Sequence, residues 1–178
     1  VLNDQGEIVT SYDKSHLVPF GEYIPFRKTL DALFGKGSLK KITAGNVDFS
    51  AGPGPETISL PMGLPSFSGL VCYEVIFPTA VINPTQKRPG WMINVTNDAW
   101  YGNTSGPYQH LETARFRAIE EGVPLVRSAN SGVSAVFDAY GRNIGSIGLS
   151  KKGILDVFLP TPTRIVPFYA RCGDWITL

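Results

Sequence analysis

The stretch GLVCYEVIFP, Gly69 to Pro78, places a lone cysteine at the end of an apolar, β-rich run. We expect a buried strand from Phe67 to Cys72 and a helix over Glu74 to Val81. A cysteine at such a junction lies among unpaired backbone N–H groups at the positive end of a helix dipole, which stabilise a thiolate. The pattern also fits a small core residue, because free cysteine is among the most buried residue types.

The composition indicates one globular domain, predicted to span residues 1–178. Of these residues 43% are hydrophobic, which is enough for one buried core. Two cysteines and two histidines support neither a disulfide framework nor a zinc site rich in these residues, so no metal and no cofactor is expected. The 16 Lys and Arg residues nearly balance the 15 Asp and Glu residues, which argues against nucleic acid as a partner.

Apolar periodicity predicts short strands and few helices. The clearest helix is expected from Pro107 to Glu121, with Ser105 as its N-cap and Gly122 as its stop. Hairpins beside strand-helix units favour a layered α/β or α+β sandwich over an all-parallel sheet. The predicted strands cover residues 8–12, 57–60, 67–72, 91–96, 125–129, 133–138, 144–149 and 154–159.

A basic amphipathic helix is expected between Phe26 and Lys41, where apolar residues recur at helical spacing among lysines and an arginine. One interpretation is a helix that lies on a membrane surface. The other is an ordinary helix that packs on the core and keeps a solvated basic face.

The stretch SYDKSHLVPFGEYIPF, Ser11 to Phe26, brackets an apolar loop with Lys14 and Glu22. Charges beside such a loop need partners if they are buried. The pattern is compatible with a site that holds an ammonium and a carboxylate together. Taken alone, however, it favours a solvated lysine and a surface glutamate.

Five motifs occur in an order that resembles the nitrilase (carbon-nitrogen hydrolase) superfamily. They are the Lys14 motif, the Cys72 motif, NVTNDAWYGNTSGPYQH from Asn94 to His110, RAIEEGVPLVRSANSG from Arg117 to Gly132, and the turn that starts at Asp138. Within the superfamily, HLVPFGEYIPF and NDAWYGNTSGPYQH are similar to the apolipoprotein N-acyltransferases, a family of bacterial enzymes that add the last acyl chain to lipoproteins. The resemblance covers nearly the whole chain.

The resemblance implies an αββα sandwich, present here as an incomplete part, and a Glu-Lys-Cys triad. It makes Cys72 the nucleophile and Lys14 the cation that steadies the thiolate and the oxyanion. Glu22 matches a second glutamate of the family, which positions the other two. The general-base glutamate of the family precedes the lysine motif, and no residue of this chain matches it.

Four further residues are expected around the nucleophile. The N–H of Tyr73 is a candidate oxyanion donor, and Glu74 either hydrogen-bonds near the thiol or caps the first turn of the helix. Trp100 and Tyr101 are candidates for the wall of an acyl pocket, although aromatic residues are more often core residues.

The implied reaction moves an acyl chain from a phospholipid, through a cysteine thioester, to the N-terminal diacylglyceryl-cysteine amine of an apolipoprotein. The expected location is the bacterial inner membrane, with the catalytic domain on the periplasmic side. No apolar run here approaches the roughly 20 residues that span a bilayer, and the start, Val-Leu-Asn-Asp, has no initiator Met, so we interpret the chain as a piece of a longer protein. The resemblance implies that the transmembrane helices of the parent protein lie outside this chain. Alone it is expected to be inactive.

Three alternatives stay open. The first is a soluble amidase of the same superfamily, and the second is a non-catalytic fragment that binds lipid or a lipoprotein N-terminus. The third is a cysteine-histidine hydrolase, which would need His16 or His110 beside Cys72.

Overall fold

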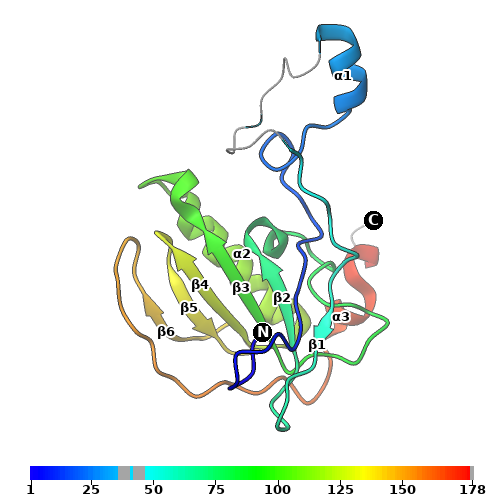
Figure 1. The fold of residues 1–178 in the computed structure, drawn as a ribbon. Helices are drawn as coiled ribbons and strands as arrows, with labels where there is room; N and C mark the ends of the chain where they lie inside the picture. Colours follow the sequence, from blue (N-terminus) through cyan, green and yellow to red (C-terminus); the bar gives the residue numbers. More distant parts are fainter. Residues whose placement is uncertain (36–40, 42–46, 177–178) are drawn as a thin grey trace. The chain divides into compact units, whose positions relative to one another are not determined.

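The structure is a computed structural model that describes residues 1–35, 41 and 47–176. The chain forms two compact units (Figure 1). Val1–Tyr12 and Pro55–Leu178 make the first unit, and Asp13–Gly54 makes the second. We describe each unit by itself, and the single domain expected from the length stays a prediction.

The first unit is built on a six-stranded mixed sheet in which the strands lie in chain order. The three central strands, β2, β3 and β4, run parallel, and antiparallel strands flank them on both sides. The mixed α/β class predicted from the sequence is thereby confirmed. The strands are β1 (Thr57–Ile58), β2 (Phe67–Val71), β3 (Trp91–Asn97), β4 (Leu125–Asn130), β5 (Ser134–Phe137) and β6 (Asn143–Ile147).

Short helical segments connect the parallel strands. The 3-10 helix η1 (Cys72–Ile76) follows β2, and the 3-10 helix η2 (Asp98–Tyr101) follows β3 and leads into α2 (Gly106–Glu121). Gly122 ends α2 in a left-handed conformation, with φ 62°, and its N–H donates to the carbonyls at the end of the helix. Two short helices near the C-terminus are α3 (Phe168–Cys172) and η3 (Gly173–Ile176).

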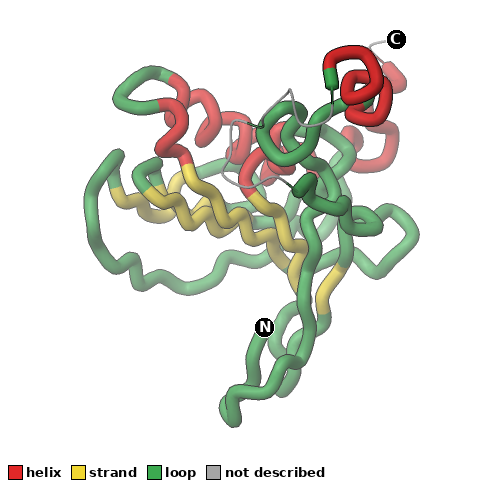
Figure 2. The backbone as a smooth tube through the Cα atoms, turned by 45° about the horizontal axis from the view of Figure 1, so that its top comes forward, coloured by secondary structure: helices red, strands yellow, loops and turns green. Residues whose placement is uncertain are grey.

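Helix α2 packs on one face of the sheet, as Figure 2 shows, and the core lies between them. Along β3 the side chains of Met92, Asn94 and Thr96 are buried while their neighbours are less so, which is the alternation expected of a sheet with one covered face. This arrangement supplies one helical and one sheet layer. The core residues are Leu70, Val75, Val81, Ile82, Met92, Ala114, Ala118, Val123, Leu125, Ala135 and Phe137.

Three sequence predictions were wrong in detail. The helix expected over Glu74 to Val81 is the short η1, because Pro78 forces the preceding Phe77 into an extended conformation, with φ −85° and ψ 112°. The strand expected at residues 8–12 contributes only an isolated bridge to Leu2. Residues 154–159 form no strand.

Two smaller differences concern side chains. Ile154 and Phe158 are 97% and 98% exposed, so the apolar alternation there marks a segment that packs into no core within the described part of the chain. Ser105 precedes α2 as expected but makes no side-chain cap hydrogen bond.

The second unit carries one helix, α1 (Arg27–Phe34), and none of its residues is buried. Arg27 forms an ion pair with Asp48 at 2.6 Å, which ties the start of α1 to the returning chain. Within the expected basic amphipathic stretch, the structure has the helix at Arg27–Phe34, and Lys36 and Lys40 lie outside the described residues. Within the described ranges, no helix combines the length and the apolar character that a membrane span requires.

Candidate active site

The carboxyl ends of β2, β3 and β4 lie together at one edge of the sheet, because the three strands are parallel and adjacent. Cys72 follows β2, Asp98 follows β3 and Ser131 follows β4. In open α/β sheets this edge is where ligands usually bind. The candidate site is therefore built on the turns that leave these strands.

Cys72 adopts a left-handed backbone conformation, with φ 53°. The preceding Val71 is still extended, so the chain turns sharply at the cysteine, which is half-buried. A residue with a Cβ atom is unfavourable in this conformation and persists there only where its surroundings hold it. Such strain is typical of functional positions.

Glu74 holds the turn from one side. Its carboxylate accepts a hydrogen bond of 2.8 Å from the N–H of Val71 and one of 2.9 Å from the hydroxyl of Tyr12. This is the capping geometry, one of the two alternatives left open for Glu74. Tyr73, the next residue after the cysteine, packs edge-on against Phe77 with ring centroids 5.0 Å apart.

Asn94 holds the turn from the side of β3. Its amide group donates to the carbonyl of Leu70 at 3.2 Å and to the carbonyl of Cys72 at 3.4 Å. The side chain is fully buried, so these bonds satisfy donors that water does not reach. The cysteine is thus attached to the neighbouring strand through its own carbonyl oxygen.

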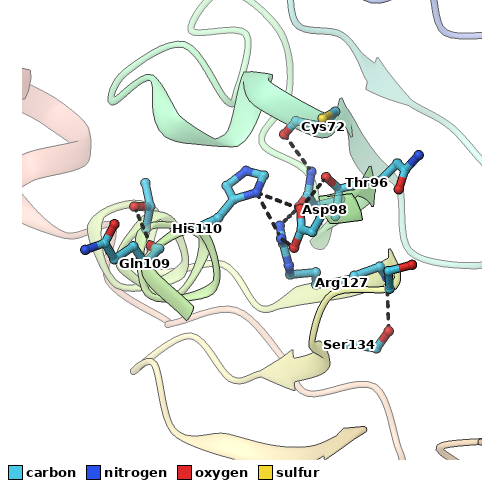
Figure 3. A network of polar contacts seen from close by, with 12 residues as sticks. Cys72, Thr96, Asp98, Gln109, His110, Arg127 and Ser134 are labelled. Carbon is cyan, nitrogen blue, oxygen red and sulfur yellow. Dashed lines mark hydrogen bonds and ion pairs between the residues drawn. The ribbon is translucent and has the colours of Figure 1, made fainter. Parts of the chain in front are cut away.

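Arg127 on β4 lies behind Asn94 and is also buried. Its guanidinium donates to the amide oxygen of Asn94 and to a carboxylate oxygen of Asp98 at 2.6 Å. Figure 3 shows Arg127 and His110 converging on Asp98, with Cys72 joined to the same network. The network links all three parallel strands.

Burial and pairing oppose each other in this network. Burial favours the neutral form of Asp98, but the hydrogen bond from His110 and the charge of Arg127 outweigh it, so the pKa of Asp98 is lowered. Burial lowers the pKa of Arg127 despite the charge of Asp98.

His110 on α2 is buried, and its Nδ1 lies 2.9 Å from Asp98. Its Nε2 is buried without a hydrogen-bond partner among the described residues. The same Nδ1 atom also lies 3.1 Å from the guanidinium of Arg127, but it can hydrogen-bond only one of the two groups, because the carboxylate accepts and the guanidinium donates. An aspartate at Nδ1 and a free Nε2 are also features of a general base, but no hydrogen bond joins this ring to Cys72 among the described residues.

Trp100 and Tyr101 lie on η2, beside the network. Trp100 is 64% exposed, so it is not the core residue that an isolated aromatic usually is. The ring of Tyr101 lies 5.9 Å from that of His110, and burial, followed by the charge of Asp98, raises the pKa of its hydroxyl. Their predicted role as pocket walls stays a prediction.

Lys14 and Glu22 meet in the second unit. The Nζ atom of Lys14 lies 2.7 Å from both carboxylate oxygens of Glu22, and the two side chains are only 11% and 18% exposed. Glu22 also accepts from the N–H of Val18. The ammonium and the carboxylate are thus held together, while the catalytic roles of both residues stay predictions.

Sequence reasoning missed Tyr12, Asn94, Asp98 and Arg127. A signal existed for Asn94, which occupies an inward-facing position of β3 between the buried Met92 and Thr96. A polar residue at such a position needs a partner.

No cluster of three or more metal-binding side chains is found in residues 1–35, 41 and 47–176.

Comparison with known proteins places the chain in a family. Residues 1–163 match the family model described as Carbon-nitrogen hydrolase. The Apolipoprotein N-acyltransferases of Bradyrhizobium diazoefficiens and Rhodopseudomonas palustris are 49% and 47% identical to this chain, over 98% and 97% of the chain's length. The chain spans about a third of the length of these relatives, 31% in each case.

Solved structures agree with this placement at the level of the fold. A mutant of the amidase from Nesterenkonia sp. AN1, with acrylamide added at its active site cysteine, matches with a TM-score of 0.51 and 22% identity. The match covers 84% of this chain and 51% of that one. This likeness concerns the fold, and the family match over residues 1–163 establishes that the chain belongs to the carbon-nitrogen hydrolase family.

Proposed function

We propose that this chain carries the nucleophile of an N-acyltransferase that matures lipoproteins. The acyl donor is a phospholipid, and the acceptor is the N-terminal diacylglyceryl-cysteine amine of an apolipoprotein. The observation that carries the chemistry is Cys72, held in a left-handed turn at the carboxyl edge of a parallel sheet. The name of relatives at 44–49% identity supports the substrate class.

The proposed reaction has two steps through one covalent intermediate. The thiolate of Cys72 attacks the ester carbonyl, a C–S bond forms, the ester C–O bond breaks, and the lysophospholipid leaves with a proton. The amine of the acceptor then attacks the thioester, an amide forms, and the thiol is released. Two lipid substrates therefore need not occupy the site at the same time.

The resemblance assigns the remaining roles in this proposal. Lys14 supplies a positive charge for the thiolate and the oxyanion, and Glu22 orients Lys14 through the ion pair at 2.7 Å. The N–H of Tyr73 is proposed as an oxyanion donor, a group whose loss typically lowers kcat by about 100- to 1000-fold. Proton transfer is assigned to the family glutamate that precedes the lysine motif.

A membrane surface is the proposed place of action, at the periplasmic side of the bacterial inner membrane. Phe26, Leu33 and Phe34 expose apolar side chains around α1, where no residue is buried. Exposed aromatic and aliphatic groups beside basic ones are typical of helices that bind a lipid interface. In this proposal α1 contacts the lipid that donates the acyl chain.

Two other functions remain as alternatives. The likeness to an amidase keeps a soluble amidase open, and that enzyme would turn over a water-soluble amide and leave phospholipid intact. A binding fragment would hold lipid without consuming it.

The test uses the full-length protein that contains this chain, with phosphatidylethanolamine and a diacylglyceryl peptide. Mass spectrometry should find the triacylated peptide and one lysophospholipid for each product. Cys72→Ser should remove both products, because a serine hydroxyl ionises far less readily than a thiol. Cys172→Ser is the matched control, since it removes the other cysteine and should keep activity. If the protein turned over a water-soluble amide but not phospholipid, the acyltransferase proposal would fail and the amidase alternative would take its place.

A further inference from the structure

Three residues at matching positions of the parallel strands form a line across the sheet. Leu70 on β2 pairs with Asn94 on β3, and Asn94 pairs with Arg127 on β4. The register therefore places the two polar side chains on the same face of neighbouring strands. Both are buried beside the turn that carries Cys72.

Both donor hydrogens of the Asn94 amide have an acceptor in this position. Its nitrogen has two donor hydrogens, and two carbonyls lie within reach, those of Leu70 and Cys72 at 3.2 and 3.4 Å. These carbonyls flank Val71, the last residue of β2. The side chain thus spans the point at which the strand becomes the left-handed turn.

Arg127 determines which way this amide faces. Its guanidinium donates to the oxygen of Asn94, so the nitrogen end must point toward the turn. A second nitrogen of Arg127 bonds Asp98 at 2.6 Å, which neutralises the buried charge and fixes the guanidinium plane. Figure 3 shows this connection from Arg127 through Asp98 toward His110.

Cys72 needs such support more than an ordinary residue does. Its φ of 53° is unfavourable for any side chain with a Cβ atom. A backbone held in an unfavourable region relaxes when its restraints are removed. Relaxation would move the sulfur, and a displacement of about 1 Å can cost a reacting group about 100-fold in rate.

We propose that Asn94 and Arg127 are positioning residues for the nucleophile: Arg127 orients the amide of Asn94, and this amide holds the backbone of Cys72 in its left-handed turn. Neither residue touches the substrate. The inference rests on the proposed function only in taking Cys72 as the reactive thiol.

The test measures the reactivity of Cys72 directly, in the full-length protein that contains this chain. Iodoacetamide alkylation is followed on the peptide that carries Cys72, near neutral pH, in three variants: Asn94→Leu, Arg127→Lys and the double variant. Leucine keeps the number and branching of the side-chain heavy atoms and removes both donors. Lysine keeps a cation beside Asp98 but not the planar fork that reaches two partners.

Each single variant should lower the alkylation rate by about tenfold or more, and kcat for acyl transfer should fall while KM stays unchanged. Because Arg127 acts through Asn94, the double variant should be no slower than Asn94→Leu alone. Additive losses would overturn the order of action, and unchanged or faster alkylation in Asn94→Leu would overturn the positioning role.

The matched control is Ser68→Ala, which removes a buried hydrogen bond of 2.6 Å from the same strand β2. It should lower the melting temperature and leave the alkylation rate unchanged. A comparable loss in this control would mean that general destabilisation causes the effect, and the inference would fail. Alkylation needs no acyl donor, so it can be measured even if the protein transfers no acyl chain. Alkylation rates that follow the expected pattern in a protein without acyl transfer would count against the proposed function and not against the positioning role.

Discussion

The left-handed backbone of Cys72 predicts an unusual order of stability between two variants that lack the thiol. At φ 53° a residue with a Cβ atom is disfavoured by about 1 to 2 kcal/mol. Glycine avoids this cost but loses about 0.5 to 1 kcal/mol more on folding, because its unfolded chain is freer. The midpoints of the two ranges differ by about 0.75 kcal/mol, so Cys72→Gly should be more stable than Cys72→Ala by about that amount.

The control is the same pair of substitutions at Gln109, an exposed position within α2. In a helix, glycine is less stable than alanine by about 1 kcal/mol, so the order should reverse. Thermal unfolding of the four purified variants measures both differences. For a domain of this size the shift at Cys72 corresponds to about 1 to 4 °C. If Cys72→Gly melted below Cys72→Ala, the turn would carry no strain and the need for a support would disappear.

Three other variants test separate parts of the account. Lys14→Arg should lower acyl transfer by about 100-fold, because Lys14 and Glu22 are largely buried and a bulky, planar guanidinium spreads the positive charge that a compact ammonium would concentrate on the thiolate and the oxyanion; a rate near that of the unaltered protein would make Lys14 a structural residue. Gly132→Ala should lower the free energy of unfolding by about 1 to 3 kcal/mol, since its new Cβ would lie 2.2 Å from the Asp98 carboxylate, and a melting temperature that does not change would contradict this. Acid should also weaken the fold: the pKa of Asp98 lies below its ordinary 3.8, so its stabilisation is complete above that value and is lost as the pH falls through the lowered pKa. The melting temperature should then fall more steeply with acid in the unaltered protein than in Asp98→Asn, and parallel curves would refute it.

The central strands and α2 could be predicted because each carries its own local signal. Strands β2, β3 and β4 are short apolar runs, and α2 has helical spacing with a glycine stop at Gly122. Placing Cys72 at the end of a strand needed only the order of residues along the chain. The ion pair of Lys14 and Glu22 was within reach for the same reason, since the two residues lie eight positions apart.

The network behind Cys72 could not be predicted in this way, because it depends on strand register. Asn94 and Arg127 are 33 positions apart in the sequence and meet only because β3 and β4 pair in one particular alignment. Local patterns do not specify that alignment. The longer helix predicted after Cys72 was wrong for a different reason. The prediction relied on the apolar pattern and did not take into account that Pro78 disfavours a helical conformation at the residue before it.

The thioester on Cys72 is the central claim, and it can be trapped. The full-length protein that contains this chain is incubated with phosphatidylethanolamine and no acceptor, and its intact mass and peptide map are then measured. The account predicts an acyl-sized mass increase on the peptide that carries Cys72, removed by hydroxylamine. An unmodified Cys72, in a preparation that transfers acyl chains once acceptor is added, would contradict it.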